Sequence, residues 1–134
     1  MAAEQNVELV RRLSRSFNER RFDDLEGTVF SPALVYRHNG REDGLKRWMK
    51  DSKDCVVSFP DAKEVIEEIT PDGDRVSIAF RFQGTHLGPL GQTEPTGMKF
   101  DVAGKATYRI MDNLIVEATE QVDEDALMRQ LGLK

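Results

Sequence analysis

Apolar residues recur at helical spacing near the start of the chain. Val7, Val10, Leu13 and Phe17 fall on one side of this segment, opposite a group of arginines. The pattern predicts a first helix over residues 4–20.

A short second helix and a strand are expected next. Asp23 can cap a helix that holds Leu25 and Val29. This helix should end near Ser31-Pro32, because the residue before a proline avoids helical geometry. Residues 33–38 then have the composition of a short strand.

A third helix is predicted to begin around Asp43. Leu45, Trp48 and Met49 lie on one of its sides and basic residues lie on the other. Its apolar side should therefore close over a sheet.

After Phe59-Pro60-Asp61 the apolar pattern changes to the two-residue period of strands. Asp72-Gly73 and Asp112-Asn113 are pairs that tolerate the positive φ of tight hairpins. The strands predicted in this way cover residues 64–70, 75–86, 98–111 and 114–122. A short helix that Asp123 caps at its N-terminus follows them.

Helices that come first, followed by a run of antiparallel strands, indicate an α+β fold in which helices pack on one face of a curved sheet. A chain of 134 residues is long enough to bury a core of its own, so we expect one domain over residues 1–134. Residues 87–97 are rich in glycine and proline and predict a shaped loop.

A histidine ends the apolar side of the longest alternating segment. Successive strand side chains point to opposite faces, so one face should hold Val76, Ile78, Phe80, Phe82 and His86. An imidazole would then lie among aromatic side chains. A lone strand histidine can also be a hydrogen-bonded core or rim residue.

The same alternation, applied to the last predicted strand, finds a carboxylate on its apolar side. The even positions of residues 114–122 are apolar except for Glu120. A buried, unpaired carboxylate tends to have a raised pKa, which makes it useful as a base or acid near neutral pH. We therefore expect Glu120 and His86 to face one interior, although a glutamate near a strand end can also reach solvent.

Composition narrows the function classes. The net charge of −5 argues against nucleic-acid binding. Cys55 is the only cysteine, which fits a reducing cytoplasm, and two histidines without close cysteine or histidine neighbours argue against a zinc site. No apolar run approaches the ~18 residues that span a bilayer, and the first residues do not resemble a secretory leader. We expect a cytoplasmic protein that holds no metal and does not associate with a membrane.

Five ordered motifs resemble those of the SnoaL-like polyketide cyclases, which share the fold of nuclear transport factor 2 and ketosteroid isomerase. They are Phe59-Pro60-Asp61, Gly84-Thr85-His86-Leu87-Gly88, Pro95-Thr96-Gly97, Arg109-Ile110-Met111-Asp112 and Gln130-Leu131-Gly132. The resemblance extends from about residue 6 to residue 132. It implies a cone-shaped sheet wrapped by helices, a pocket that opens into the cone, and acid–base chemistry without a metal or organic cofactor.

The resemblance also implies roles for single residues. The aldol-type cyclases of the family have a carboxylate at the position of Glu120, which takes a proton from the carbon next to a carbonyl. Those enzymes carry aspartate there, an imidazole where this chain has Ala106, and an amide where it has Tyr36, with His38 two residues on. A tyrosine, a histidine and a glutamate are closer to the branch of the family that opens epoxides to form cyclic ethers.

The leading hypothesis is an acid–base enzyme that acts on a hydrophobic, oxygenated small molecule. Glu120 would be the general base, His86 would donate a hydrogen bond to the developing oxyanion or act as the acid, and Tyr36 would be a second donor. A half-buried tyrosine, however, needs only one partner for its hydroxyl. Substrate contacts are expected from His38, Trp48, Phe59, Phe82 and Tyr108, although core packing explains Trp48 and Phe59 equally well.

Two other functions remain open. The pocket could open an epoxide, in which case Glu120 activates an alcohol or a water molecule. The fold also serves as a binding or dimerisation module, and a fold alone does not settle activity. Family members commonly pair through the outer face of the sheet, so we expect a homodimer through Arg81, Gln83, Thr107, Arg109, Thr119 and Gln121.

Overall fold

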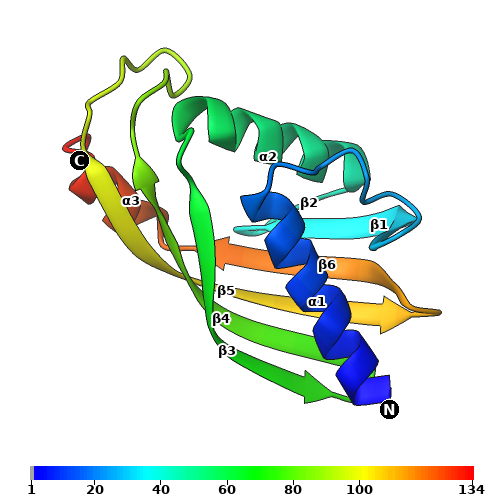
Figure 1. The fold of residues 1–134 in the computed structure, drawn as a ribbon. Coiled ribbons are helices and arrows are strands. Elements are labelled where there is room, and N and C mark those ends of the chain that lie inside the picture. The colour runs from blue at the N-terminus through cyan, green and yellow to red at the C-terminus, as the bar shows by residue number, and fades with distance from the viewer. Residues whose placement is uncertain (1) are drawn as a thin grey trace.

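A strongly curved sheet of six strands dominates the computed structural model, which describes residues 2–134 (Figure 1). Its strand order is β2-β1-β6-β5-β4-β3, and β2 and β3 form its two open edges. The strands are β1 (Phe30–His38), β2 (Arg41–Asp43), β3 (Lys63–Asp72), β4 (Arg75–Thr85), β5 (Lys99–Met111) and β6 (Leu114–Val122). The pair of β1 and β6 is parallel, and every other described pair is antiparallel.

Three helices in the described part of the chain pack against this sheet: α1 (Ala2–Asn18), α2 (Leu45–Ser58) and α3 (Glu124–Gln130). In Figure 1, α1 crosses the concave face over β3 and β4, α2 lies above β1, and α3 lies beside the far end of β5. The expected α+β class with helices on one face of a curved sheet is therefore confirmed.

Apolar and polar residues alternate along the strands because helices cover only one face of the sheet. Along β5 the residues from Lys99 to Met111 alternate between buried and more exposed positions. Phe100, Tyr108 and Ile110 lie on the buried side, where the helices cover the sheet. The predicted strands, the first and third helices, and the N-cap of the last helix are confirmed; Asp123 accepts a hydrogen bond from the backbone of Ala126 at 3.0 Å.

The short second helix expected after Asp23 is wrong. The backbone forms a tight turn there: the amides of Val29 and Phe30 both donate to the carbonyl of Leu25, at 2.9 and 2.8 Å. Gly27 adopts φ +78°, which a right-handed helix does not allow. The spacing of Leu25 and Val29 therefore reflects their burial in this turn and not a helix.

The first strand is longer than expected, and its short partner was missed. β1 begins at Phe30 and includes Pro32, which lies where the pairing of β1 with β6 is irregular between Phe30 and Val35. A proline lacks an amide hydrogen and is tolerated at such places. β2 then returns from Asn39-Gly40 and pairs with the end of β1.

Candidate active site

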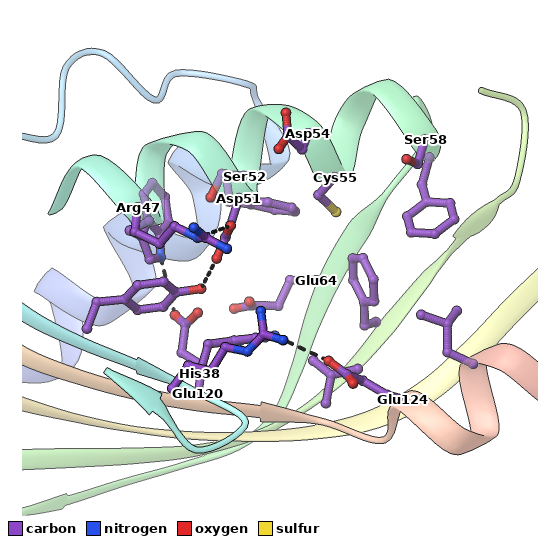
Figure 2. A pocket seen from close by; sticks show the side chains of 18 of the residues that line it. His38, Arg47, Asp51, Ser52, Asp54, Cys55, Ser58, Glu64, Glu120 and Glu124 are labelled. Carbon is purple, nitrogen blue, oxygen red and sulfur yellow. Dashed lines mark hydrogen bonds and ion pairs between the residues drawn. The ribbon is translucent and has the colours of Figure 1, made fainter. Parts of the chain in front are cut away.

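A cavity of about 1080 Å³ lies between α2 and the concave face of the sheet (Figure 2). Residues of all three helices and of every strand contribute to its wall. One side carries Glu120, Tyr108 and Tyr36, and another is formed by Phe59 and Phe82. The cavity thus combines a polar region with an apolar wall, as small-molecule sites commonly do.

Glu120 lies in the polar region and is held by two neutral donors. Its Oε2 accepts hydrogen bonds from the Tyr108 hydroxyl at 3.1 Å and, more weakly, from Trp48 Nε1 at 3.5 Å. Burial raises the pKa of this carboxyl, while charge on His38 and the two hydrogen bonds act in the opposite direction. Among the described residues no hydrogen bond reaches Oε1, so this oxygen is available to a bound molecule.

Tyr36 is already engaged by a carboxylate of α2. Its hydroxyl donates to Asp51 Oδ2 at 3.1 Å, and Arg47 Nε donates to Asp51 Oδ1 at 3.0 Å (Figure 2). Burial, together with the charges of Glu120 and Asp51, raises the pKa of Tyr36. Tyr36 therefore lies in the cavity as expected, but it keeps its proton and directs it toward Asp51.

His38 lies beside Glu120 in the parallel pairing of β1 and β6. Its Nε2 is 3.8 Å from Glu124 Oε1, and its buried Nδ1 has no hydrogen-bond partner in the described structure. The predicted contact residues His38, Trp48, Phe59, Phe82 and Tyr108 all line the cavity together with Glu120 and Tyr36.

His86 does not line the cavity, and the structure does not bring it together with Glu120. The alternation of β4 still holds at this position, since the backbone amide of His86 donates to the carbonyl of Met98 at 2.9 Å, and the imidazole lies beside an aromatic ring as expected, but outside the cavity wall. The imidazole is completely buried and packs edge-on against the ring of Phe59, with centroids 5.8 Å apart. Phe59 does line the cavity.

The imidazole of His86 organises the loop that follows it. Its Nδ1 accepts a hydrogen bond from the backbone amide of Thr96 at 3.1 Å and lies 3.0 Å from the Thr96 hydroxyl. An acceptor at Nδ1 requires a neutral ring with its proton on Nε2. The backbone of His86 also bonds to Met98 and Gly97, so this residue joins the two ends of the 87–97 loop.

The same loop is fixed to the end of α2. The carbonyl of Ser58 accepts the amides of Leu87 and Gly88 at 3.1 and 3.0 Å, and its hydroxyl donates to the carbonyl of Pro89 at 2.7 Å. A Cβ atom at Gly88 would lie 1.9 Å from the Val57 carbonyl oxygen, so only glycine allows this approach. Pro89 and the two residues after it then form part of the cavity wall.

The His86→Ala variant is expected to lose about 2 kcal/mol of unfolding free energy, because it opens a void and leaves the Thr96 amide without its acceptor. Urea unfolding followed by circular dichroism measures this loss. Thr93→Ala, a change at a less buried residue of the same loop, is the control. A His86→Ala variant as stable as the wild type would contradict the structural role.

Glu64 is a cavity residue that the sequence pattern did not single out. It lies opposite Phe82 in the pairing of β3 with β4, and its carboxylate points into the cavity (Figure 2). Burial, and then the charge of Glu120, raise its pKa to about 7, against a hydrogen bond from Ser14. Glu64 shares a face with Ile66, so the test that found Glu120 could have found it too.

Asp51 and Arg47 were missed for a different reason. They lie on the polar side of α2, which was expected to face solvent, whereas both line the cavity. Within residues 2–134, no group of three histidine, cysteine, aspartate or glutamate side chains is arranged to hold a metal ion. No helix of the described chain is long and apolar enough to span a membrane.

One comparison with known proteins identifies a family. The model of the family described as SnoaL-like polyketide cyclase matches residues 7–131. A search of curated proteins gives no significant match.

Solved structures with similar folds include three bacterial proteins. AclR from Streptomyces galilaeus has a TM-score of 0.89 at 20% identity, over 98% of this chain and 87% of its own. IdmH from Streptomyces antibioticus has a TM-score of 0.87 at 23% identity, over 96% and 99%. A SnoaL-like polyketide cyclase from Agrobacterium tumefaciens has a TM-score of 0.76 at 23% identity, over 92% and 95%. At these identities the likeness establishes the fold alone.

Proposed function

The chain belongs to the family of SnoaL-like polyketide cyclases, and we propose that it is an acid–base enzyme that needs neither metal nor organic cofactor. Its substrate is a hydrophobic, oxygenated small molecule such as a polyketide-derived intermediate. The observation that carries this proposal is Glu120, a carboxylate in a partly apolar cavity with one oxygen held by Tyr108 and Trp48 and the other open.

Glu120 acts as the general base in this proposal. Its Oε1 takes a proton from the carbon next to a carbonyl, and the resulting enolate attacks a second carbonyl or is protonated elsewhere. Tyr108 and Trp48 fix the carboxylate through Oε2, which keeps Oε1 directed at the substrate. A positioned base of this kind contributes about 10²–10⁴-fold to a rate.

The cavity wall supports an elongated substrate with one oxygenated end. Phe59 and Phe82 form an apolar wall, and their rings lie edge-on with centroids 6.3 Å apart. His38 and the indole of Trp48 lie near Glu120. We assign the apolar part of the substrate to the phenylalanines and its reacting carbonyl to the polar region.

A second candidate reaction is the opening of an epoxide, by ring closure or with water. The specific observation in its favour is Glu64, a second carboxyl that faces the same cavity as Glu120 and whose pKa is raised to about 7. One carboxylate can activate the attacking hydroxyl while a protonated carboxyl donates to the ring oxygen.

Two probe reactions separate these candidates. The first is exchange of the C1 protons of 2-tetralone with D₂O, followed by proton NMR, and the second is opening of styrene oxide. The leading proposal predicts exchange well above the buffer rate, and the second candidate predicts opening of the epoxide. If the protein binds 2-tetralone, as quenching of Trp48 fluorescence would report, but accelerates neither reaction, it is a non-catalytic binding module.

A homodimer in the cytoplasm stays a prediction. The outer face of the sheet is polar, with Arg81 paired to Asp101 and Arg109 paired to both Asp74 and Glu117. Such a face can pair with a second copy through charged and hydrogen-bonding groups. Light scattering at micromolar concentration is expected to give the mass of two chains, and the mass of one chain would contradict the prediction.

A further inference from the structure

We infer that Glu64 is the second acid–base group of the cavity and donates a proton to the substrate oxygen on which negative charge develops, while Glu120 takes a proton on the other side. This inference rests on the proposed function and deepens it, because it assigns the donor role that sequence reasoning gave to His86. It also defines the substrate class: the molecule must present an acidic C–H or O–H bond and a carbonyl or ether oxygen within one cavity.

The position of Glu64 suits this role. It projects from β3, across the curved sheet from β6, and in Figure 2 its carboxylate is directed toward the side of the cavity that holds Glu120. The two carboxyls are close enough for the charge of Glu120 to affect the protonation of Glu64. A substrate between them would contact both.

Neither carboxyl is paired with a lysine or an arginine. Within residues 2–134 no lysine or arginine forms an ion pair with Glu64 or Glu120, and Arg47 is bonded to Asp51. The other titratable or charged groups that line the cavity are Tyr36, His38, Arg41, Glu42, Asp43, Asp54, Cys55, Tyr108 and Glu124. Two partly buried carboxylates without a lysine or arginine as counter-charge repel each other, so one of them retains a proton near neutral pH.

The contacts indicate which carboxyl retains the proton. Glu120 accepts hydrogen bonds from Tyr108 and Trp48 and lies beside His38, all of which favour its ionised form. Glu64 has only the hydroxyl of Ser14 as a comparable donor, and its pKa is raised to about 7. Glu120 is therefore the base and Glu64 the acid.

Other donors near the cavity are already committed. The Tyr36 hydroxyl donates to Asp51, and the hydroxyl of Tyr108 donates to Glu120. Burial raises the pKa of the Cys55 thiol to about 12, which makes it a poor acid. His86 lies outside the cavity wall. Unlike these groups, Glu64 can both donate a hydrogen bond and give up its proton.

The proton transfers balance for both candidate reactions. In enolisation, the C–H proton passes to Glu120, the C–H electron pair forms the C=C bond, and the carbonyl oxygen takes the proton of Glu64. In epoxide opening, the attacking hydroxyl loses its proton to Glu120, a C–O bond forms as the ring C–O bond breaks, and the ring oxygen takes the proton of Glu64. Solvent then returns each carboxyl to its starting state.

The first test is independent of turnover. In protein labelled with ¹³C at the glutamate carboxyls, the Glu64 signal, assigned by its loss in Glu64→Gln, should titrate near pH 7. Glu68→Gln, an exposed change on the same strand, is the control for the assignment and should leave the Glu64 signal in place. A Glu64 carboxyl that is fully ionised at about pH 6 would overturn the inference whatever the probe reactions show.

The second test is the pH dependence of 2-tetralone exchange. The wild-type rate should rise as Glu120 ionises and fall as Glu64 loses its proton near pH 7. Glu64→Gln should lose the falling limb and exchange about 10²-fold more slowly below pH 7, whereas Glu68→Gln should match the wild type.

The outcomes distinguish the inference from the proposed function. If Glu120→Gln is inactive while Glu64→Gln keeps both the rate and the falling limb, the inference fails and the proposed function stands. If Glu120→Gln is as active as the wild type, the proposed function itself fails. A wild-type protein without any exchange activity would also count against the proposed function, while the carboxyl titration would still decide the protonation of Glu64.

Discussion

The Glu120→Gln variant is expected to exchange the C1 protons of 2-tetralone about 10²–10⁴-fold more slowly than the wild type. Glutamine preserves the size of the side chain, and its amide oxygen can still accept from Tyr108 and Trp48. The variant lacks only a basic oxygen at the Oε1 position. The effect should therefore appear in the rate of proton transfer and leave binding of 2-tetralone, measured through Trp48 fluorescence, within a few-fold.

Glu117→Gln is the matched control for this experiment. Glu117 lies on the same strand but on the outer face of the sheet, where it pairs with Arg37 and Arg109 at 3.0 Å. Its pKa is lowered by the hydrogen bonds from those arginines, which is the opposite of the shift at Glu120. A comparable loss of exchange in Glu117→Gln would show that destabilisation of β6, rather than loss of the base, explains the result.

The period of the apolar pattern was sufficient to place Glu120. β6 pairs with the middle strand β5, where alternation is regular, and Ala106 lies directly opposite Glu120 in the register. Because both residues lie on the covered face, a carboxylate at this even position had to point toward the helices. The fold class followed from the same pattern, since the long strands β4, β5 and β6 each showed one apolar side.

The pattern was less informative at the ends of strands. His86 is buried beside Phe59, as the alternation predicts, but it lies where β4 turns into the 87–97 loop, outside the cavity that holds Glu120. Glu64 lies at the start of β3 on the same face as Ile66, before the register shift between Ile66 and Glu68, so the test of alternation applies to it as well. Alternation identifies the face that a residue occupies, whereas the curvature of the sheet decides which residues of that face meet in one cavity.

The cavity itself could not be predicted from spacing alone. Its polar region depends on α2 lying over β1, which brings Asp51 to the Tyr36 hydroxyl, 15 positions away in the sequence. The polar side of α2 therefore faces partly into the cavity at Arg47 and Asp51. The spacing of apolar residues identifies the side of a helix that packs against the sheet. It does not show which of the neighbouring polar residues border a cavity.

Glu64 should make the stability of the protein depend on pH. Its pKa is about 7 in the folded state and close to 4.5 in the unfolded chain, so the folded state binds the extra proton between these values. Stability from this group is complete below about pH 4.5 and is lost as the pH rises through about 7, by about 3 kcal/mol in total. Above that pH, no further loss from Glu64 is expected.

The Glu64→Gln variant removes this dependence. It should match the wild type at about pH 5 and be more stable by up to about 3 kcal/mol at about pH 8, as measured by urea unfolding at both values. Glu68→Gln, an exposed change on the same strand, should behave like the wild type at both. The quantity to compare is the difference in unfolding free energy between variant and wild type. Both proteins contain the ion-paired carboxyl of Glu117, whose lowered pKa gives stability the opposite dependence on pH, and this contribution cancels in the difference.

A Glu64→Gln variant that is less stable than the wild type at about pH 8 would mean that favourable contacts stabilise the ionised form of Glu64. That result would exclude Glu64 as a proton donor at neutral pH.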